Sequence, residues 1–116
     1  MRIVLKIAVL IIFIILAVIF INSRKSTKSD MFLKTIDNKK ISANSYKVEN
    51  PKGWLILVHM MPATKESWEE FAEEMRESGY ESLAIDLRGH GESEGGPDGY
   101  QKFSDEEHQN GIHDLE

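Results

Sequence analysis

Residues 54–93 decide the fold, and they read WLILVHMMPATKESWEEFAEEMRESGYESLAIDLRGHGES. Two short apolar runs, residues 54–58 and 83–87, flank a longer amphipathic segment. A helix between two buried-type strands predicts a right-handed crossover that joins parallel neighbours in one sheet. Ligands bind at the carboxyl ends of such strands, and the sequence places His59 and Asp86 there. We therefore expect a functional edge at these two residues.

The segment between the two apolar runs, residues 65–78, predicts a helix that Gly79 ends. Its apolar side chains recur at helical spacing and share one face: Trp68, Phe71, Ala72 and Met75. Such a stripe is typical of a helix that covers a sheet. Much of the remaining surface carries glutamates, for which we favour a solvated acidic face over a metal site: Glu69, Glu70, Glu73, Glu74 and Glu77.

Further elements are predicted on both sides of this unit. Two weaker strand candidates, residues 32–36 and 41–48, flank the turn sequence DNKK and predict a β-hairpin. Near the other end, Ser104 and Glu107 have the spacing of a capping box, which predicts a helix that reaches the end of the chain. The expected fold class is therefore α/β, with a hairpin, a β–α–β unit with parallel strands, and a helix.

The N-terminal segment predicts a membrane anchor. Residues 3–21 are apolar except for Lys6, and as a helix they measure about 28 Å, close to the hydrocarbon thickness of a bilayer. A cleaved signal peptide would need small residues at the cleavage site, and the sequence IFINSR follows instead. We favour an uncleaved transmembrane helix over a cleaved signal or a buried soluble helix. Basic residues stand on both sides of the span, so the sequence leaves its orientation open.

Charge and cysteine content exclude several classes of site. The first 30 residues hold five basic residues and one acidic residue, a net charge of +4, which leaves −9 for the rest of a chain whose total is −5. A part this acidic argues against a nucleic-acid partner. The absence of cysteine excludes disulfides, thiolate metal sites and a cysteine nucleophile. His108 and His113, on different faces of one helix, make a poor zinc pair, so no metal site is predicted.

A family resemblance rests on features that follow one another in the chain. They are His59 at the end of a strand, Ser67-Trp68 at a helix start, Gly79-Tyr80 at its end, and the loop DLRGHGES at residues 86–93. On these features the chain resembles the N-terminal portion of an α/β-hydrolase, similar to esterases and lipases, over residues 31–116. The resemblance implies a serine hydrolase that needs no cofactor and acts on small carboxylic esters or acylglycerol-like substrates through a Ser–His–Asp triad.

The resemblance also implies roles for particular residues. The loop after the first strand would supply part of an oxyanion hole, with the backbone N–H of Met61 as the donor and His59 and Met60 in support. Many relatives have glycine where this chain has Met60, and Pro62 has no N–H to donate. The glycine-rich loop is expected to form the rim of the site: Asp86, Arg88, Gly89, His90 and Gly91. Asp86 is interpreted as a hydrogen-bond acceptor at a strand end, because the triad acid should follow the nucleophile.

No catalytic residue is assigned within the 116 residues. The sequence GESEG around Ser93 matches the G-x-S-x-G pattern, but it follows a turn instead of a buried strand, and no helix follows it. We therefore expect the nucleophile, acid and base beyond Glu116, in a longer chain. The predicted domains are residues 1–22 as the anchor, 23–30 as a juxtamembrane linker and 31–116 as an incomplete hydrolase domain. The alternative is a non-catalytic, membrane-tethered acidic module that binds a partner protein.

Overall fold

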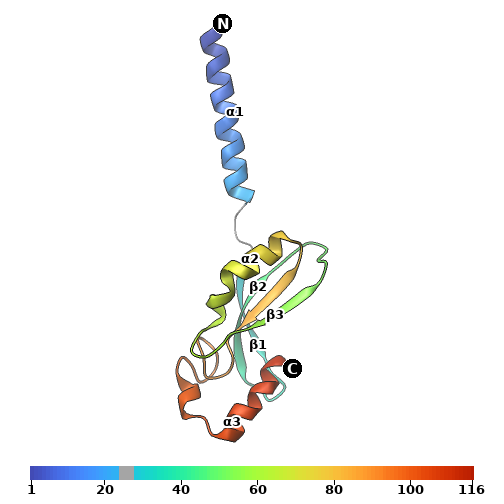
Figure 1. Cartoon of the computed structure of the whole chain (residues 1–116), viewed down its shortest axis with the longest axis vertical. Coiled ribbons are helices and arrows are strands. Elements are labelled where there is room, and N and C mark those ends of the chain that lie inside the picture. Colours follow the sequence, from blue (N-terminus) through green and yellow to red (C-terminus); the bar gives the residue numbers. More distant parts are fainter. Residues whose placement is uncertain (24–27) are drawn as a thin grey trace.

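The computed structural model describes residues 1–23 and 28–116. It consists of a long N-terminal helix followed by a small domain with one mixed sheet (Figure 1). The elements, in chain order, are α1 (Arg2–Ser23), β1 (Lys28–Lys34), β2 (Lys40–Tyr46), β3 (Trp54–Val58), the 3₁₀ helix η1 (Lys65–Trp68), α2 (Glu69–Glu77), β4 (Glu81–Ile85), η2 (Gly99–Lys102), α3 (Asp105–Gln109) and η3 (Asn110–Leu115).

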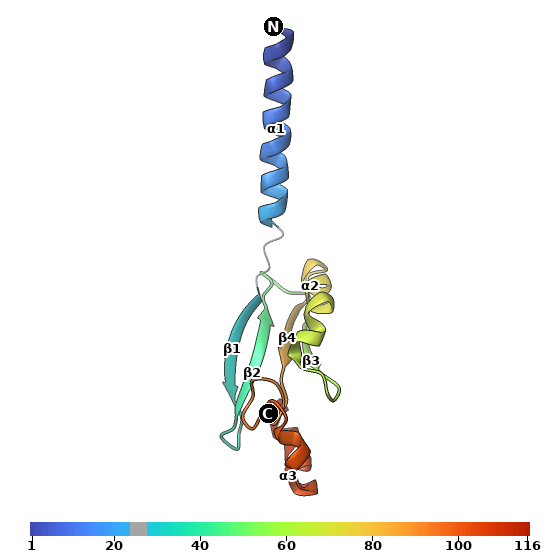
Figure 2. The same cartoon turned by 90° about the vertical axis from the view of Figure 1, so that its left-hand side faces the viewer.

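The sheet has the strand order β1-β2-β4-β3. β1 and β2 form the predicted hairpin, and β2 also pairs antiparallel with β4. β3 and β4 are parallel neighbours, joined by η1 and α2, which confirms the predicted crossover unit. Figure 2 shows β1, β2 and β4 side by side, with α2 next to β4 and β3.

The two faces of the sheet are covered unequally. On one face, Tyr46, Leu57 and Ala84 pack with Ala72 of α2. Side chains alternate between faces along a strand, and on the other face Ile41, Ala43 and Ile85 form a second cluster. At the outer end of that second face, Trp54 and Ile56 of β3 remain 74% and 59% exposed. α2 therefore covers only one side of the sheet, while Leu115 of η3 lies beside a pocket on the other side.

Several element boundaries differ from the expected ones. β1 begins at Lys28, so residues 28–30, expected in the linker, belong to the sheet. The predicted helix over residues 65–78 starts as the 3₁₀ turn η1, and its apolar stripe is incomplete because Phe71 is 39% exposed. Its end is as expected: Gly79 has a φ of 90°, and Gly79 and Tyr80 donate back to the carbonyls of Arg76 and Met75, a Schellman motif.

The C-terminal helix is shorter than predicted. Its capping box is confirmed, because the hydroxyl of Ser104 accepts from the N–H of Glu107 and the Glu107 carboxylate accepts from the N–H of Ser104. The α-helix ends at Gln109 and continues as the 3₁₀ helix η3. Gly111 lies in this 3₁₀ segment, and glycine is a weak helix former.

α1 is the one helix among the described residues that is long and apolar enough to cross a membrane. Its candidate span is Arg2–Phe20, and none of that span is buried inside the protein. A signal sequence near an N-terminus has the same length and composition. The helix is thus compatible with an anchor and with a cleaved leader.

Candidate active site

His59 joins the two loops at the carboxyl edge of the parallel strands. The register pairs Val58 with Ile85, so His59 and Asp86 leave the sheet side by side. The Nε2 atom of His59 accepts a hydrogen bond of 3.2 Å from the N–H of Leu87, and Nδ1 lies 3.3 Å from the carbonyl oxygen of Met60. The proton therefore belongs on Nδ1. Burial lowers the pKa of His59, which favours this neutral form.

Met61 lies in a tight turn directly after His59. The carbonyl of Met60 accepts a 2.7 Å hydrogen bond from the N–H of Ala63, which closes the turn. The side chains of Met60 and Met61 point outward and are 80% and 58% exposed. Among residues 1–23 and 28–116, no partner accepts a hydrogen bond from the N–H of Met61. This donor is consequently available to a ligand.

The carboxylate of Asp86 is fully buried and fully occupied. Its Oδ1 accepts from the backbone N–H of Lys65 at 2.7 Å. Its Oδ2 accepts from the Lys65 ammonium at 3.0 Å and from the N–H of Glu92 at 3.1 Å. Asp86 is therefore a structural acceptor that fastens three backbone segments together.

Lys65 carries a buried ammonium group among three carboxylates. Its side chain is 1% exposed, and Nζ lies 2.8 Å from Glu92 and 3.0 Å from both Asp86 and Glu66. Burial opposes the charge, but the hydrogen bonds to Glu92, Glu66 and Asp86 outweigh it and hold the pKa of Lys65 above its usual value. Since Lys65 begins η1, this cluster fixes the end of the loop that contains Met61.

The sequence did not indicate the role of Lys65, which looked like an ordinary residue at a helix start. One signal could have found it. Asp86 was predicted at the end of a buried strand, and a buried carboxylate needs a cation or several N–H donors. A lysine at the mouth of the neighbouring loop is a natural candidate for that cation.

Two glycines of the loop are required by close contacts. Gly91 has a φ of 48°, and a Cβ there would lie 2.2 Å from Oδ2 of Asp86. Gly89 has a φ of 73°, and a Cβ there would lie 2.6 Å from the ring of Phe103. Both positions thus combine a left-handed backbone with a lack of space, and only glycine fits them.

Arg88 connects the loop to two distant segments. Its Nη1 and Nη2 donate to both oxygens of Asp37 in the hairpin turn, at 2.7 and 3.0 Å. Its Nε and backbone N–H each donate to Asp114 near the C-terminus at 2.7 Å. The Arg88 guanidinium, together with the hydroxyl of Thr35, holds the pKa of Asp37 well below its usual range. Arg88 therefore ties the hairpin and η3 to the glycine-rich loop.

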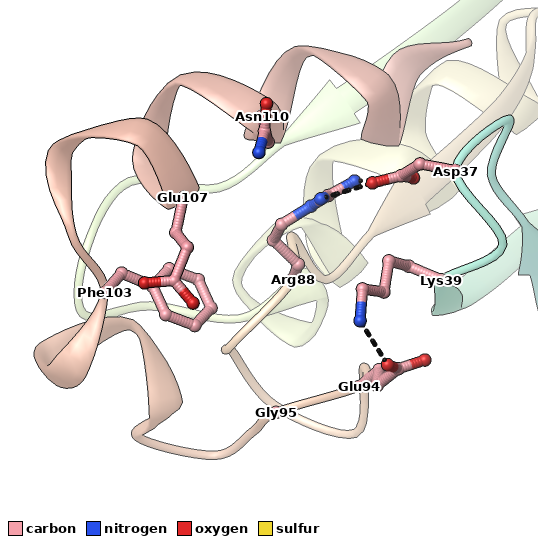
Figure 3. A pocket seen from close by; sticks show the side chains of 8 residues that line it. All are labelled: Asp37, Lys39, Arg88, Glu94, Gly95, Phe103, Glu107 and Asn110. Atoms are coloured by element: carbon pink, nitrogen blue, oxygen red, sulfur yellow. Dashed lines mark hydrogen bonds and ion pairs between the residues drawn. The ribbon is translucent and has the colours of Figure 1, made fainter.

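A charged pocket surrounds this contact. Figure 3 shows Arg88 directed toward Asp37, with Lys39 and Glu94 paired beside them at 2.8 Å. The full lining consists of Asp37, Lys39, Arg88, Glu94, Gly95, Phe103, Glu107 and Asn110. Arg88 and Lys39 in its wall are paired with Asp37 and Glu94. These ion pairs hold the loops together, and we interpret the pocket as part of that structural contact.

Ser93 is held inside the fold. Its hydroxyl donates a 2.6 Å hydrogen bond to the carbonyl of Asp86 and accepts a 2.8 Å bond from the N–H of Ser42. The side chain is 4% exposed. A hydroxyl with both roles filled and no access to solvent is not arranged as a nucleophile.

His90 is largely buried and packs between two other rings. Its ring stacks on Tyr100 at 4.2 Å between centroids and contacts His59 at 4.8 Å. Nδ1 donates to the carbonyl of Arg88 at 3.1 Å, and Nε2 has no partner among the described residues. Asp86, Arg88, Gly89 and His90 are all buried, and Arg88 and His90 line a pocket together with Met61.

The described ranges contain no group of three or more histidine, aspartate or glutamate side chains with the geometry of a metal site. His108 packs edge-on against Phe103, and His113 pairs with Glu116 at 2.8 Å. The two histidines thus make separate local contacts.

Three solved structures that resemble part of this chain are hydrolases. An esterase from Pyrococcus furiosus matches with a TM-score of 0.58 and 26% identity, over 81% of this chain and 33% of the esterase. An epoxide hydrolase from Vigna radiata matches with a TM-score of 0.51 and 25% identity, over 58% of this chain and 21% of the enzyme. An epoxide hydrolase from an endophytic Streptomyces matches with a TM-score of 0.50 and 27% identity, over 57% and 19%. The chain therefore spans about a fifth to a third of the length of these structures.

No curated protein matches the chain significantly. A family profile described as the alpha/beta hydrolase fold matches residues 53–115, which is more than half of the chain. That region holds β3, β4 and both loops of the candidate site. The chain belongs to the alpha/beta hydrolase fold family.

Proposed function

We propose that the chain forms the N-terminal part of a membrane-anchored serine hydrolase that cleaves small carboxylic esters or acylglycerol-like compounds. Met61 donates its backbone N–H to the oxyanion, and His59 and Met60 shape the turn that presents it. The nucleophile, acid and base come from residues outside 1–116. The family and the hydrolases with similar structures support the hydrolase class.

The unpartnered N–H of Met61 is the observation that carries this proposal. It lies at the carboxyl edge of two parallel strands, where ligands bind in such sheets. Acyl transfer develops negative charge on a carbonyl oxygen, and a preorganised N–H lowers the free energy of that state. A free donor at this edge is suited to that use.

The buried hydroxyl of Ser93 supports a nucleophile elsewhere. Its two hydrogen bonds hold β2 and the end of β4 together. An attacking serine needs a base within hydrogen-bond reach, and the hydroxyl of Ser93 instead donates to a carbonyl. A serine in a true strand-to-helix elbow is expected in the complete enzyme.

Anchoring rests on the length and composition of α1. Residues 3–21 would cross the bilayer, and the hydrolase domain would be held at the membrane by a single N-terminal helix. We expect the full-length protein to stay in the membrane fraction after alkaline carbonate washing, and its N-terminal sequence to start at residue 1 or 2. A soluble protein that starts after residue 22 would instead identify α1 as a cleaved leader.

A fluorophosphonate probe tests the catalytic proposal. The 116-residue chain should not be labelled, whereas the complete hydrolase should be labelled once, at a serine outside these residues. Stoichiometric labelling of Ser93 would overturn our assignment of that serine. An open reading frame with no G-x-S-x-G elbow downstream of residue 116 would favour the non-catalytic acidic module.

Two substitutions of one residue test the oxyanion donor. In the complete hydrolase, Met61→Pro removes the N–H and should lower kcat about 100-fold, as loss of one oxyanion donor does elsewhere. Met61→Ala keeps the N–H and should leave kcat within about twofold, because the side chain is exposed. Equal losses in both variants would show that the side chain or the turn matters, and not the donor.

A further inference from the structure

The direction of the strands fixes which end of the domain faces the anchor. Ser23 ends α1 and Lys28 begins β1, with four residues between them. β1 is antiparallel to β2, which is antiparallel to β4, so β1 runs parallel to β4 and β3. All three of these strands therefore start near the anchor, and their carboxyl ends point away from the segment that enters the membrane helix.

The candidate site lies one strand length further out. The N–H of Asp86 bonds to the carbonyl of Ser42, and Ser42 stands opposite Phe32 in β1. Phe32 is four residues beyond Lys28, so the row that contains Asp86 is about 13 Å from the start of β1. Figure 1 shows the glycine-rich loop and α3 beyond this row, at the end of the domain far from α1.

The connection to α1 is too short for the domain to turn over. From Ser23 to Lys28 the chain reaches at most about 18 Å, even fully extended. If the site faced the bilayer, the roughly 13 Å of strand and the thickness of α3, about 10 Å, would separate Lys28 from the membrane surface. This distance of roughly 23 Å exceeds the reach of the connection. The headgroup layer adds a further distance of about 5 Å or more.

The distribution of charge also favours a site that faces away from the bilayer. Residues 86–116 hold nine acidic and two basic residues, a net charge of −7, whereas residues 22–30, between the span and the domain, hold Arg24, Lys25 and Lys28 against Asp30, a net charge of +2. The acidic side chains that are exposed at this end include Glu94, Asp98, Asp105, Glu106 and Glu107. Anionic headgroups repel such a surface and attract basic juxtamembrane residues.

We propose that the site opens away from the bilayer and takes water-soluble, neutral or cationic esters, in preference to acyl lipids that reside in the membrane. The inference rests on the proposed hydrolase function and anchor, and it narrows their substrate class. The short connection supplies the geometry, and the acidic loops disfavour anionic substrates that approach the site.

The cysteine-free sequence permits a direct test of the placement. Glu49→Cys and Glu106→Cys are matched changes at exposed positions, the first in the turn before β3 and the second in α3. Each variant of the 116-residue chain is labelled with a donor dye and reconstituted into phosphatidylcholine vesicles that contain rhodamine-labelled headgroups. Energy transfer to the lipid should be several-fold stronger from position 49 than from position 106. Equal transfer, or stronger transfer from position 106, would overturn the proposed placement.

A second measurement tests the substrate class on the complete hydrolase in the same vesicles. A soluble cationic fluorophosphonate should react about tenfold faster than a soluble anionic one, because the local field attracts cations. It should also react faster than the same phosphonate attached to a phospholipid. Faster reaction of the lipid-bound probe would contradict the substrate class. No reaction with any probe would contradict the proposed hydrolase function, while energy transfer reports the placement independently.

Discussion

The two loops that leave β3 and β4 at the same edge of the sheet are held in opposite ways. In the loop after β4, the carboxylate of Asp86, the guanidinium of Arg88 and the hydroxyl of Ser93 are all buried and hydrogen-bonded. In the loop after β3, Met60 and Met61 are exposed, and the N–H of Met61 has no partner among the described residues. A donor kept free for a ligand cannot be fixed by its own hydrogen bonds, so the neighbouring loop has to hold it.

The link between the loops passes through two contacts. At the start of the loop after β3, His59 accepts a hydrogen bond from the N–H of Leu87. At the end of the same loop, the backbone N–H of Lys65 donates to Asp86. Both ends of the Met61 turn are thus fastened to the segment after β4. The hydrogen-bonded loop after β4 therefore holds the loop after β3 in its shape.

Removal of the Asp86 charge should have the largest effect. Asp86→Asn leaves the buried ammonium of Lys65 without its most buried partner, and loss of one member of a buried pair costs about 3 kcal/mol or more. Urea unfolding of the full chain in detergent micelles, followed by tryptophan fluorescence, measures the loss. Asp98→Asn is the control, because Asp98 is exposed and its side chain makes no hydrogen bond to a described residue. Equal midpoints for the two variants would contradict a central role for Asp86.

A methyl group in the same loop should have the next largest effect. Gly91→Ala places a Cβ 2.2 Å from the Asp86 carboxylate at a positive φ, and we expect a loss of about 2 kcal/mol in the free energy of unfolding. Gly111→Ala has no atom within 4 Å of the new Cβ and lies in a helical segment, so it should be neutral or slightly stabilising. If neither alanine changed the free energy of unfolding in the same urea titration, the loop would be able to shift and make room for the added methyl group.

Acid should weaken the contact between Arg88 and the hairpin turn. The pKa of Asp37 is lowered in the folded state by Arg88 and Thr35, so its contribution to stability is present above the unfolded pKa, near 4, and is lost as the pH falls below that value. The difference in urea midpoint between wild type and Asp37→Asn should therefore shrink steadily from pH 5 to pH 2. If the difference in urea midpoint between wild type and Asp37→Asn did not change with pH, titration of the Asp37 carboxylate could not be the cause of that difference.

Local signals predicted most of the fold. The apolar runs of β3 and β4, the Schellman glycine Gly79 and the capping box at Ser104 depend on residues close together in the sequence, where periodicity and capping rules apply. The start of β1 could not be placed in this way. In its sequence, KSDMFLK, apolar and polar residues alternate only weakly. The pairing of β1 with β2 decides where the strand begins.

The support of the site depended on contacts between distant residues. Arg88 binds Asp37 from 51 positions away, and Lys65 binds Asp86 from 21. A charged residue gives no local sign that it will be buried, because the partner that makes burial possible is supplied by the tertiary structure. For the same reason the burial of Asp86, Arg88 and His90 could not be read from the sequence, and their place on the rim of a site stays a prediction. The role of Met61 stays a prediction.

The two edge strands of the sheet differ in charge. β1 has Lys28, Asp30 and Lys34 along its length, and charges of this kind discourage pairing with another strand. β3 has no charge in the sequence WLILV, and Trp54 and Ile56 are exposed beside it. A strand that joins this sheet should therefore add at β3 alone, next to the loop with the free N–H. Growth from one edge only also means that two copies paired through β3 would form a closed dimer, with no open edge suited to fibre growth.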